Sequence, residues 1–345
     1  MSAPFEPGLM TTGIGSLPLT DPDRAAEFVL AADLSAAFWP QLPRRRFYER
    51  MVPQFAELVP AVRLDEQEEA VRWEPDAKYD ELGGFYERYL ADDPSLFGLS
   101  GRVAAGFEAF RRAAGGHGLA LAKGQVTGPI TFCTSVTSAD GEPLYGDEEM
   151  RQVVSQALGM NARWQVAQLS QIAGDGVIVF VDEPVLAVFG SSALAGVSEA
   201  HVRELDGHVL AAVEDAGALS GMHVCGNSDW AVVARSGVSI VNFDAYQYGH
   251  TISLYPEAVG ELLERGGAIA WGIVPTTDAI RQEDADSLAR RFEKALSELA
   301  GKGFEEDYLR RRSLLTPSCG AGAMSEEDAR RVFRVLAELH TRLRR

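Results

Sequence analysis

The chain has 345 residues, a formal net charge of −18 at pH 7 and 46% hydrophobic residues. This acidic balance argues against a nucleic-acid partner, because phosphate binding needs clustered Lys and Arg and the only tight basic run is Arg44-Arg45-Arg46. Length alone favours two domains, but a single large α/β barrel also reaches this size.

Cysteine usage and hydropathy indicate the compartment. The three cysteines lack the spacing of a disulfide framework, which is typical of a reducing cytoplasm. Residues 1–7 contain neither a basic region nor a long apolar run, so we predict no signal peptide. No apolar stretch is long enough to span a membrane. We therefore expect a cytoplasmic protein that has no membrane partner.

Short apolar runs alternate with helical stretches along most of the chain. In chain order, strands are predicted at residues 9–17, 34–42, 119–126, 177–181, 219–224, 238–243, 268–273 and 314–316. Helices are predicted between them, with N-caps at Asp21, Ser198, Ser228 and Ser325. This alternation predicts one (β/α)8 TIM barrel over residues 1–345, and a doubly wound open sheet is the alternative.

The alternation is interrupted after the second predicted strand. An Arg-rich helix that includes Phe47, Met51 and Phe55 is expected first. Residues 61–74 then alternate apolar and polar side chains around a charged tip, which predicts a surface hairpin. Residues 79–115 are mostly helical in pattern. We predict an inserted helical and hairpin segment of roughly residues 60–117 over the barrel mouth.

Polar and metal-binding side chains stand at the ends of the predicted strands. In a barrel, the carboxyl ends of all strands meet at one mouth, where active sites are built. The side chains expected there are Ser16, Gln125, Asp182, Glu183, His223, Cys225, Asp244 and Cys319.

His223 and Cys225 end one strand, and Cys319 follows another. Two residues apart on a strand, His223 and Cys225 point to the same side. Imidazole and thiolate together suit Zn²⁺. The pattern favours a His-Cys-Cys zinc site, and a buried His beside a structural Cys is the alternative.

Five segments in this order, TTGIGSLPLT, QVTGPITF, VDEPVL, HVCG and TPSCG, resemble the catalytic barrel of cobalamin-independent methionine synthase. They are also similar to relatives in the uroporphyrinogen decarboxylase superfamily, which includes corrinoid-dependent methyltransferases. The resemblance spans nearly the whole chain. It implies a methyltransferase in which zinc, held by His223, Cys225 and Cys319, activates a thiol substrate as a thiolate. An acidic ligand follows the next strand in the family, and Asp244 is its nearest counterpart; a helix cap or a partner that supports His223 is the alternative role.

The resemblance also implies how the thiol is held. Ile14, Ser16 and Asp182 match residues that bind the amino-acid part of homocysteine, and Gln125 is a further substrate-binding candidate. Asp182 and Glu183 are the catalytic candidates, with a strand-end anchor as the alternative for Glu183. The family's Glu on an early helix has no match, because Pro53 stands in its place. Homocysteine and another thiol therefore both remain open.

The methyl donor is the last expectation from the resemblance. The long family form has a second barrel that helps to bind polyglutamylated folate, whereas this chain has one. A short form implies methylcobalamin, free or on a corrinoid carrier protein, with methyltetrahydrofolate as the alternative. Two other classes stay open. A uroporphyrinogen decarboxylase-like enzyme would need several arginines at the mouth, where the first loop offers only Arg24. A non-catalytic barrel would hold zinc in a closed four-ligand site.

Overall fold

The computed structural model describes residues 5–345. Residues 1–4, which begin the segment where no signal peptide is predicted, lie outside the described residues. Within 5–345, no helix combines the length and the apolarity needed to cross a membrane.

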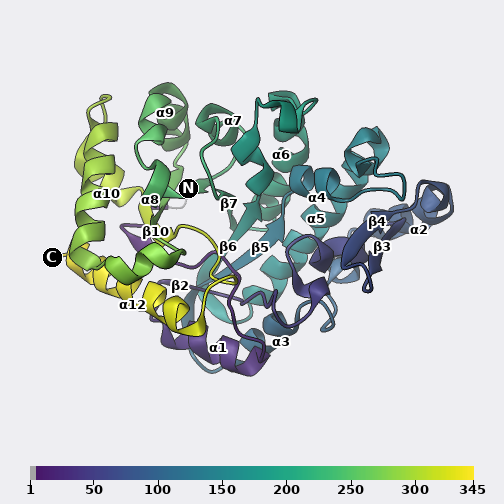
Figure 1. Ribbon diagram of the computed structural model, residues 1–345, viewed down its shortest axis with the longest axis horizontal. Helices are drawn as coiled ribbons and strands as arrows, with labels where there is room; N and C mark the ends of the chain where they lie inside the picture. The colour runs from purple at the N-terminus through teal and green to yellow at the C-terminus, as the bar shows by residue number, and fades with distance from the viewer. Residues whose placement is uncertain (1–4) are drawn as a thin grey trace.

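Eight parallel strands form the sheet at the centre of the fold (Figure 1). They are β1 (Met10–Thr11), β2 (Ala36–Phe38), β5 (Leu119–Thr127), β6 (Ala173–Asp182), β7 (Leu219–Val224), β8 (Ile240–Phe243), β9 (Ala268–Val274) and β10 (Ser313–Pro317). Their order is β1-β10-β9-β8-β7-β6-β5-β2. A parallel bridge between Thr12 and Ala36 joins the two outer strands. This closure confirms the TIM barrel and excludes the open sheet.

The first two strands are shorter than predicted. After β1 and β2, the two segments that follow these strands pair again at an isolated bridge between Ser16 and Gln41. Between these points the ring of Phe38 lies against Gly13, where an added Cβ would be 2.2 Å from the ring. The ladder between the two segments is therefore interrupted in the stretch where this ring packs on Gly13.

Helices surround the barrel. The longer ones are α1 (Pro22–Ala31), α3 (Ala105–Ala114), α5 (Glu148–Leu169), α6 (Glu199–Asp215), α9 (Pro256–Glu264), α10 (Ala285–Ala300) and α12 (Glu326–Leu343). Shorter ones are α4 (Pro129–Ser135), α7 (Trp230–Ala234), α8 (Ala245–Tyr248) and α11 (Glu306–Arg311). Phe28 of α1 meets Phe333 of α12 at 5.4 Å between ring centroids. The first and last helices of the ring, purple and yellow in Figure 1, are therefore neighbours.

Three of the four predicted N-caps are confirmed. The side chains of Asp21, Ser198 and Ser325 accept backbone N–H groups at the starts of α1, α6 and α12. The prediction for Ser228 is wrong, because α7 begins one residue later and Asp229 caps it. The Ser228 hydroxyl donates instead to the carbonyl of Leu186 at 2.8 Å.

The segment after β2 contains the predicted hairpin, formed by β3 (Val62–Asp65) and β4 (Ala70–Trp73). Helix α2 (Lys78–Leu90) follows it, and Figure 1 shows both projecting to the side of the barrel. The helix expected earlier is instead two 3₁₀ turns, η1 (Phe47–Glu49) and η2 (Pro53–Leu58), because Pro53 starts a new turn. Helix α3, also within the predicted insertion, packs on α1 in the outer ring. The inserted part therefore ends before α3.

The remaining 3₁₀ turns are η3 (Pro75–Ala77), η4 (Pro94–Phe97), η5 (Leu144–Gly146), η6 (Pro184–Val188), η7 (Ser192–Leu194), η8 (Thr251–Leu254) and η9 (Asp278–Gln282). The main core lies between sheet and helices. A smaller apolar cluster, with Leu121, Ile178, Phe180, Ile240 and Leu314, fills the barrel interior. Because side chains alternate along a strand, the inward residues that follow these toward the carboxyl ends are Lys123, Asp182 and Asn242.

Candidate functional site

A cavity of about 490 Å³ opens at the carboxyl ends of the strands. Its lining comes from the ends of β6 and β7 and from the loops after β1, β2, β6, β7 and β10: Ile14, Ser16, Gln41, Pro43, Arg44, Glu49, Arg50, Met51, Asp182, Pro184, His223, Cys225, Cys319, Gly320, Gly322 and Ala323. This is the mouth at which the barrel prediction places the active site.

His223, Cys225 and Cys319 come together on the cavity wall. Their potential ligand atoms all lie within 4.8 Å of one another. His223 is buried near the end of β7, Cys225 follows that strand, and Cys319 follows β10. The structure thus brings together the three residues for which the sequence predicts zinc binding.

Asn242 on β8 determines which nitrogen of His223 is free. The amide nitrogen of Asn242 donates to the Ala270 carbonyl and to Thr316 Oγ1, both at 2.9 Å, so its oxygen faces His223. His223 Nδ1 lies 2.5 Å from that oxygen and therefore donates to it. Nε2 is buried without a hydrogen-bond partner. Because Asn242 holds Nδ1–H, Nε2 is the nitrogen left for a metal ion, which it would bind in its unprotonated form.

The two cysteine thiols differ in acidity. The neighbouring Cys319 thiol, and after it the neighbouring His223 imidazole, lowers the pKa of Cys225 to about 4. The same contact with Cys225, together with burial, raises the pKa of Cys319 well above its usual value. Two thiol groups and an imidazole nitrogen at this distance fit a zinc ion, which these residues would hold in their deprotonated forms.

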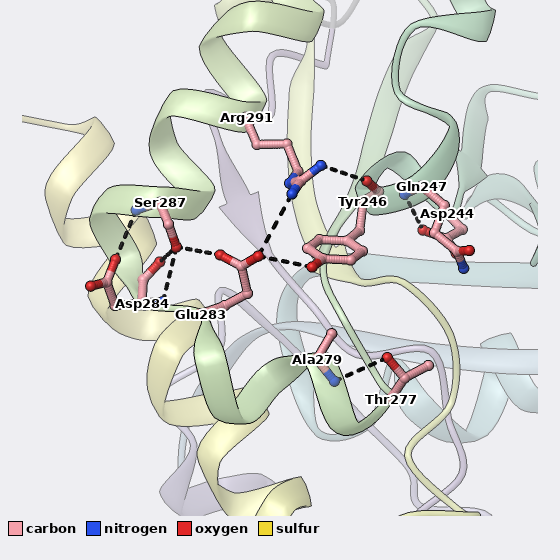
Figure 2. A network of polar contacts seen from close by, with 9 residues as sticks. All are labelled: Asp244, Tyr246, Gln247, Thr277, Ala279, Glu283, Asp284, Ser287 and Arg291. Atoms are coloured by element: carbon pink, nitrogen blue, oxygen red, sulfur yellow. Dashed lines mark hydrogen bonds and ion pairs between the residues drawn. The ribbon is translucent and has the colours of Figure 1, made fainter.

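Asp244, the predicted fourth ligand, lies outside this group. Its Oδ1 accepts the backbone N–H of Gln247 at 3.0 Å and its Oδ2 accepts the Gln247 side-chain amide at 2.7 Å (Figure 2). Nearby, Tyr246 donates to Glu283 at 2.8 Å, which ties α8 to the start of α10. Both Asp244 oxygens are thus used at the N-terminus of α8, as the helix-cap alternative expects.

Asp182 ends β6 and lines the cavity. Its Oδ1 is buried without a hydrogen-bond partner. Burial raises the pKa of Asp182 to about 6, although the charges of Lys123 and His223 act in the opposite direction. An unpartnered buried carboxylate oxygen at a cavity wall is suited to a donor group on a ligand.

Lys123 lies fully buried below the cavity and is absent from the sequence-based candidates. Its ammonium donates to the Ile14 carbonyl at 2.5 Å and to Gln125 Oε1 at 3.2 Å. It also sits 4.6 Å from the centre of the Phe180 ring. Burial lowers the pKa of Lys123 to about 8, and the charge of Asp182 opposes this. A lysine within an apolar strand was the available signal, because lysine is seldom buried unpaired.

The turn after β1 supplies another wall. Ile14 and Ser16 both line the cavity, and Ser16 Oγ accepts the Gly322 N–H at 3.2 Å. Gln125 lies beneath this turn and outside the lining. Its amide donates to the Trp39 carbonyl at 3.1 Å, and a Cβ on Gly15 would be 3.0 Å from its Cδ. The structure therefore places Gln125 as a support for the turn.

Glu183 follows Asp182 but faces away from the cavity. Its carboxylate accepts the backbone N–H groups of Ile130 and Thr131 at 2.8 and 2.9 Å, and the Thr131 hydroxyl at 2.6 Å. It thereby anchors the N-terminus of α4, as the alternative role expects. Asp206 is buried beside it, and burial together with the Glu183 charge raises the pKa of Asp206 well above its usual value.

Glu49 supplies an acid that the sequence analysis did not find. It sits on η1, is 1% exposed and lines the cavity. Arg45 donates to its Oε1 at 2.5 Å, and burial raises the pKa of Glu49. The motif comparison expected an acid at Pro53, which instead starts η2. A carboxylate thus reaches the cavity from a position four residues earlier.

The cavity mouth also carries arginines. Arg44 and Arg50 line it, both from the segment after β2. Arg24 of the first loop is not among the lining residues; it pairs with Glu326 of α12 at 2.8 Å. A decarboxylase-like site would need several arginines at the mouth. Arg44 and Arg50 supply two of them, whereas Arg24 does not.

Comparisons with known proteins found similar solved structures but no similar family model or curated sequence. No family model matches the chain, and no curated protein matches it in sequence. A B12-independent methionine synthase from Shewanella sp. W3-18-1, solved with selenomethionine, superposes with a TM-score of 0.58 at 14% identity, covering 97% of this chain and 98% of that chain. A methyltransferase from Methanosarcina mazei gives a TM-score of 0.52 at 14% identity, covering 93% and 86%. The chain therefore shares its barrel fold with a methionine synthase and a methyltransferase.

Proposed function

We propose that the protein is a zinc-dependent methyltransferase that methylates a thiol, in the manner of methionine synthase. The observation that carries the proposal is the convergence of His223, Cys225 and Cys319 on the wall of the strand-end cavity. The fold likeness to a methionine synthase and to a methyltransferase supports it.

The chain's own groups account for metal retention. His223 Nε2 and the two sulfurs would hold the ion, and Asn242 fixes the imidazole tautomer. Bound zinc supplies the positive charge that favours the thiolate form of a thiol at neutral pH. Three protein donors are one fewer than a closed structural site uses, which argues for the catalytic alternative.

The buried acids suggest a thiol that also carries an amino group. Asp182 offers an unpartnered oxygen, and Glu49 provides a second carboxylate. Glu49 offers an acid where Pro53 has none, which supports homocysteine as the first candidate among thiols. We assign Asp182 to substrate binding, with Ser16 and Ile14 beside it.

The donor proposal is a methylated corrinoid, free or on a carrier protein, with methyltetrahydrofolate as the alternative. Its basis is the resemblance, in which a short form implies a corrinoid donor. The substrate sulfur forms a bond to the methyl carbon while the cobalt–carbon bond breaks, its electron pair stays with the corrinoid, and the thiol proton leaves to solvent. The cavity's contribution is to hold both reactants in line, which can account for much of the rate gain.

A uroporphyrinogen decarboxylase-like reaction is the second candidate, favoured by Arg44 and Arg50 at the mouth. It gives no role to the three potential metal ligands. A measurement of zinc content therefore separates the two candidates.

The test is methyl transfer by the zinc-loaded protein from methylcobalamin to a panel of thiols that includes homocysteine and coenzyme M. We expect about one zinc per chain, a change in the corrinoid spectrum and a methylated thiol by mass. Cys225→Ser and Cys319→Ser should lose zinc and turnover together while staying folded.

Cys133→Ala is the matched control, because Cys133 is buried in α4 away from the site. It should keep both zinc and turnover. Full activity of a zinc-free protein would refute the proposal. Turnover with methyltetrahydrofolate but with no methylated corrinoid would overturn the donor assignment alone.

A further inference from the structure

A basic rim stands at the cavity mouth of this acidic protein. Arg44, Arg45, Arg46 and Arg50 fall within one short segment after β2, in a chain with 32 Lys and Arg against 50 Asp and Glu. Two of them, Arg44 and Arg50, line the cavity. Residues 44–50 contain one acid, Glu49, so this segment is basic although the whole chain is acidic.

Acidic neighbours neutralise part of this rim. Arg45 pairs with Glu49 at 2.5 Å. Arg50 pairs with Glu69 of the β3–β4 hairpin at 2.7 Å and lies over the ring of Phe47. Each of these guanidinium groups therefore has an ion-pair partner within the protein.

Arg44 differs from both. It is exposed, lines the cavity, and has no hydrogen bond or ion pair from its side chain anywhere in residues 5–345. A planar guanidinium in this state is suited to bind a carboxylate or a phosphate through two parallel hydrogen bonds.

The position of Arg44 indicates which reactant would bring the anion. The buried part of the cavity wall, where the thiol must reach the proposed zinc ligands, carries the carboxyl groups of Asp182 and Glu49. Arg44 lies at the solvent-exposed mouth, through which the second reactant approaches.

We propose that Arg44 is an anion-binding residue for the methyl donor. The inference rests on the proposed function for the identity of that ligand. The chemistry is shared by both donors, because methylcobalamin carries a phosphodiester and methyltetrahydrofolate carries glutamate carboxylates.

Direct binding to the zinc-loaded protein without thiol tests this, using two matched pairs of probes. Methylcobalamin is compared with methylcobinamide, which lacks the phosphodiester, and methyltetrahydrofolate with its triglutamate form. In one of the two pairs, the more anionic probe should bind more tightly than its partner, and that pair identifies the methyl donor. Arg44→Ala should reduce that preference by about threefold to fivefold at low ionic strength, the size expected for an exposed ion pair. Arg44→Lys should retain part of it.

Arg334→Ala is the control, since Arg334 is an exposed, unpaired arginine on α12 and the change alters net charge equally. A preference confined to the corrinoid pair assigns the phosphodiester, and one confined to the folate pair assigns the carboxylates. The inference is overturned if none of the probes binds, if Arg334→Ala has the same effect, or if Arg44→Ala weakens thiol binding instead. Probe discrimination without any methyl transfer would refute the proposed function and leave the anion subsite standing.

Discussion

Asp182 and Glu183 are neighbours in sequence and point to different parts of the molecule. Asp182 faces the cavity with one unpartnered oxygen. Glu183 faces α4, where it accepts two backbone N–H groups and a hydroxyl. Because successive residues of a strand alternate in direction, only one of the two acids can meet the substrate.

This difference predicts that two equivalent substitutions affect different properties, one thiol binding and the other stability. Asp182→Asn should weaken thiol binding by about 1.5–3 kcal/mol, typical of a hydrogen bond to a charged group, and leave zinc content unchanged. Glu183→Gln should instead lower stability by about 1–2 kcal/mol, through weaker capping of α4, and leave thiol binding unchanged. Thiol titrations and thermal unfolding of both variants measure this. The reverse pattern would return the catalytic role to Glu183.

Whether a site residue could be predicted from the sequence depended on its position relative to the end of a strand. His223, Cys225 and Asp182 stand at strand ends, where a barrel gathers side chains whatever the details of register. Lys123 and Asn242 lie earlier on their strands, and their inward direction is known only once the strand pairing is known. Glu49 belongs to a 3₁₀ turn, in which the predicted helical periodicity does not apply.

At the scale of elements, capping residues predicted helix starts better than apolar runs predicted strand lengths. Ser325 and Asp328 illustrate this, because their side chains bond each other and Asp328 also receives two hydrogen bonds from Arg281. These contacts connect η9 to the start of α12. The lengths of β1 and β2 were overestimated because Phe38, packed against Gly13, is a tertiary contact that local sequence does not reveal.

The Asp328 contacts predict a pH-dependent stability. Hydrogen bonds from Arg281 and Ser325 lower the pKa of Asp328 to about 2. A carboxyl whose folded pKa lies below its unfolded value of about 4 stabilises the fold above that value, and this contribution is lost as pH falls toward 2. Asp328→Asn should therefore lower Tm at pH 7, and the difference from the parent should shrink between pH 4 and 2.

Asp286→Asn is the matched control on α10. Asp286 pairs with Arg342 at 3.0 Å, but both side chains are more than half exposed. Exposed pairs contribute little, so its effect on Tm at pH 7 should be the smaller one. An equal effect of the two substitutions, or one for Asp328→Asn that does not change with pH, would show that the contacts between η9 and α12 are not stabilising.

At the scale of the whole molecule, the alternation of apolar runs and helices was enough to predict a closed eight-stranded barrel. Closure depends on the pairing of β1 with β10 and on the bridge between Thr12 and Ala36. Strands β1 and β10 lie near opposite ends of the sequence, and no local pattern indicates that they pair. The extent of the insertion was predicted less well, because α3 and α2 have similar helical patterns and only packing distinguishes them. Phe107 of α3 contacts Trp39 and Trp164, which places that helix in the ring.

The position of the proposed zinc site relative to the core predicts how the molecule responds to metal removal. Cys225 and Cys319 lie beyond the ends of β7 and β10, while both core clusters and the barrel closure are formed without them. Chelation should therefore abolish activity but leave a folded barrel, unlike small domains that fold only around a metal.

Loss of a ligand present at about a thousandfold above its Kd removes about 4 kcal/mol of stability, or roughly 6 °C in Tm for a chain of this size. Circular dichroism and thermal scans before and after chelation, with zinc added back, measure both effects. In Cys225→Ser the same treatment should change nothing. Unfolding of the parent on chelation would mean that the ion is structural, and would favour the non-catalytic zinc barrel.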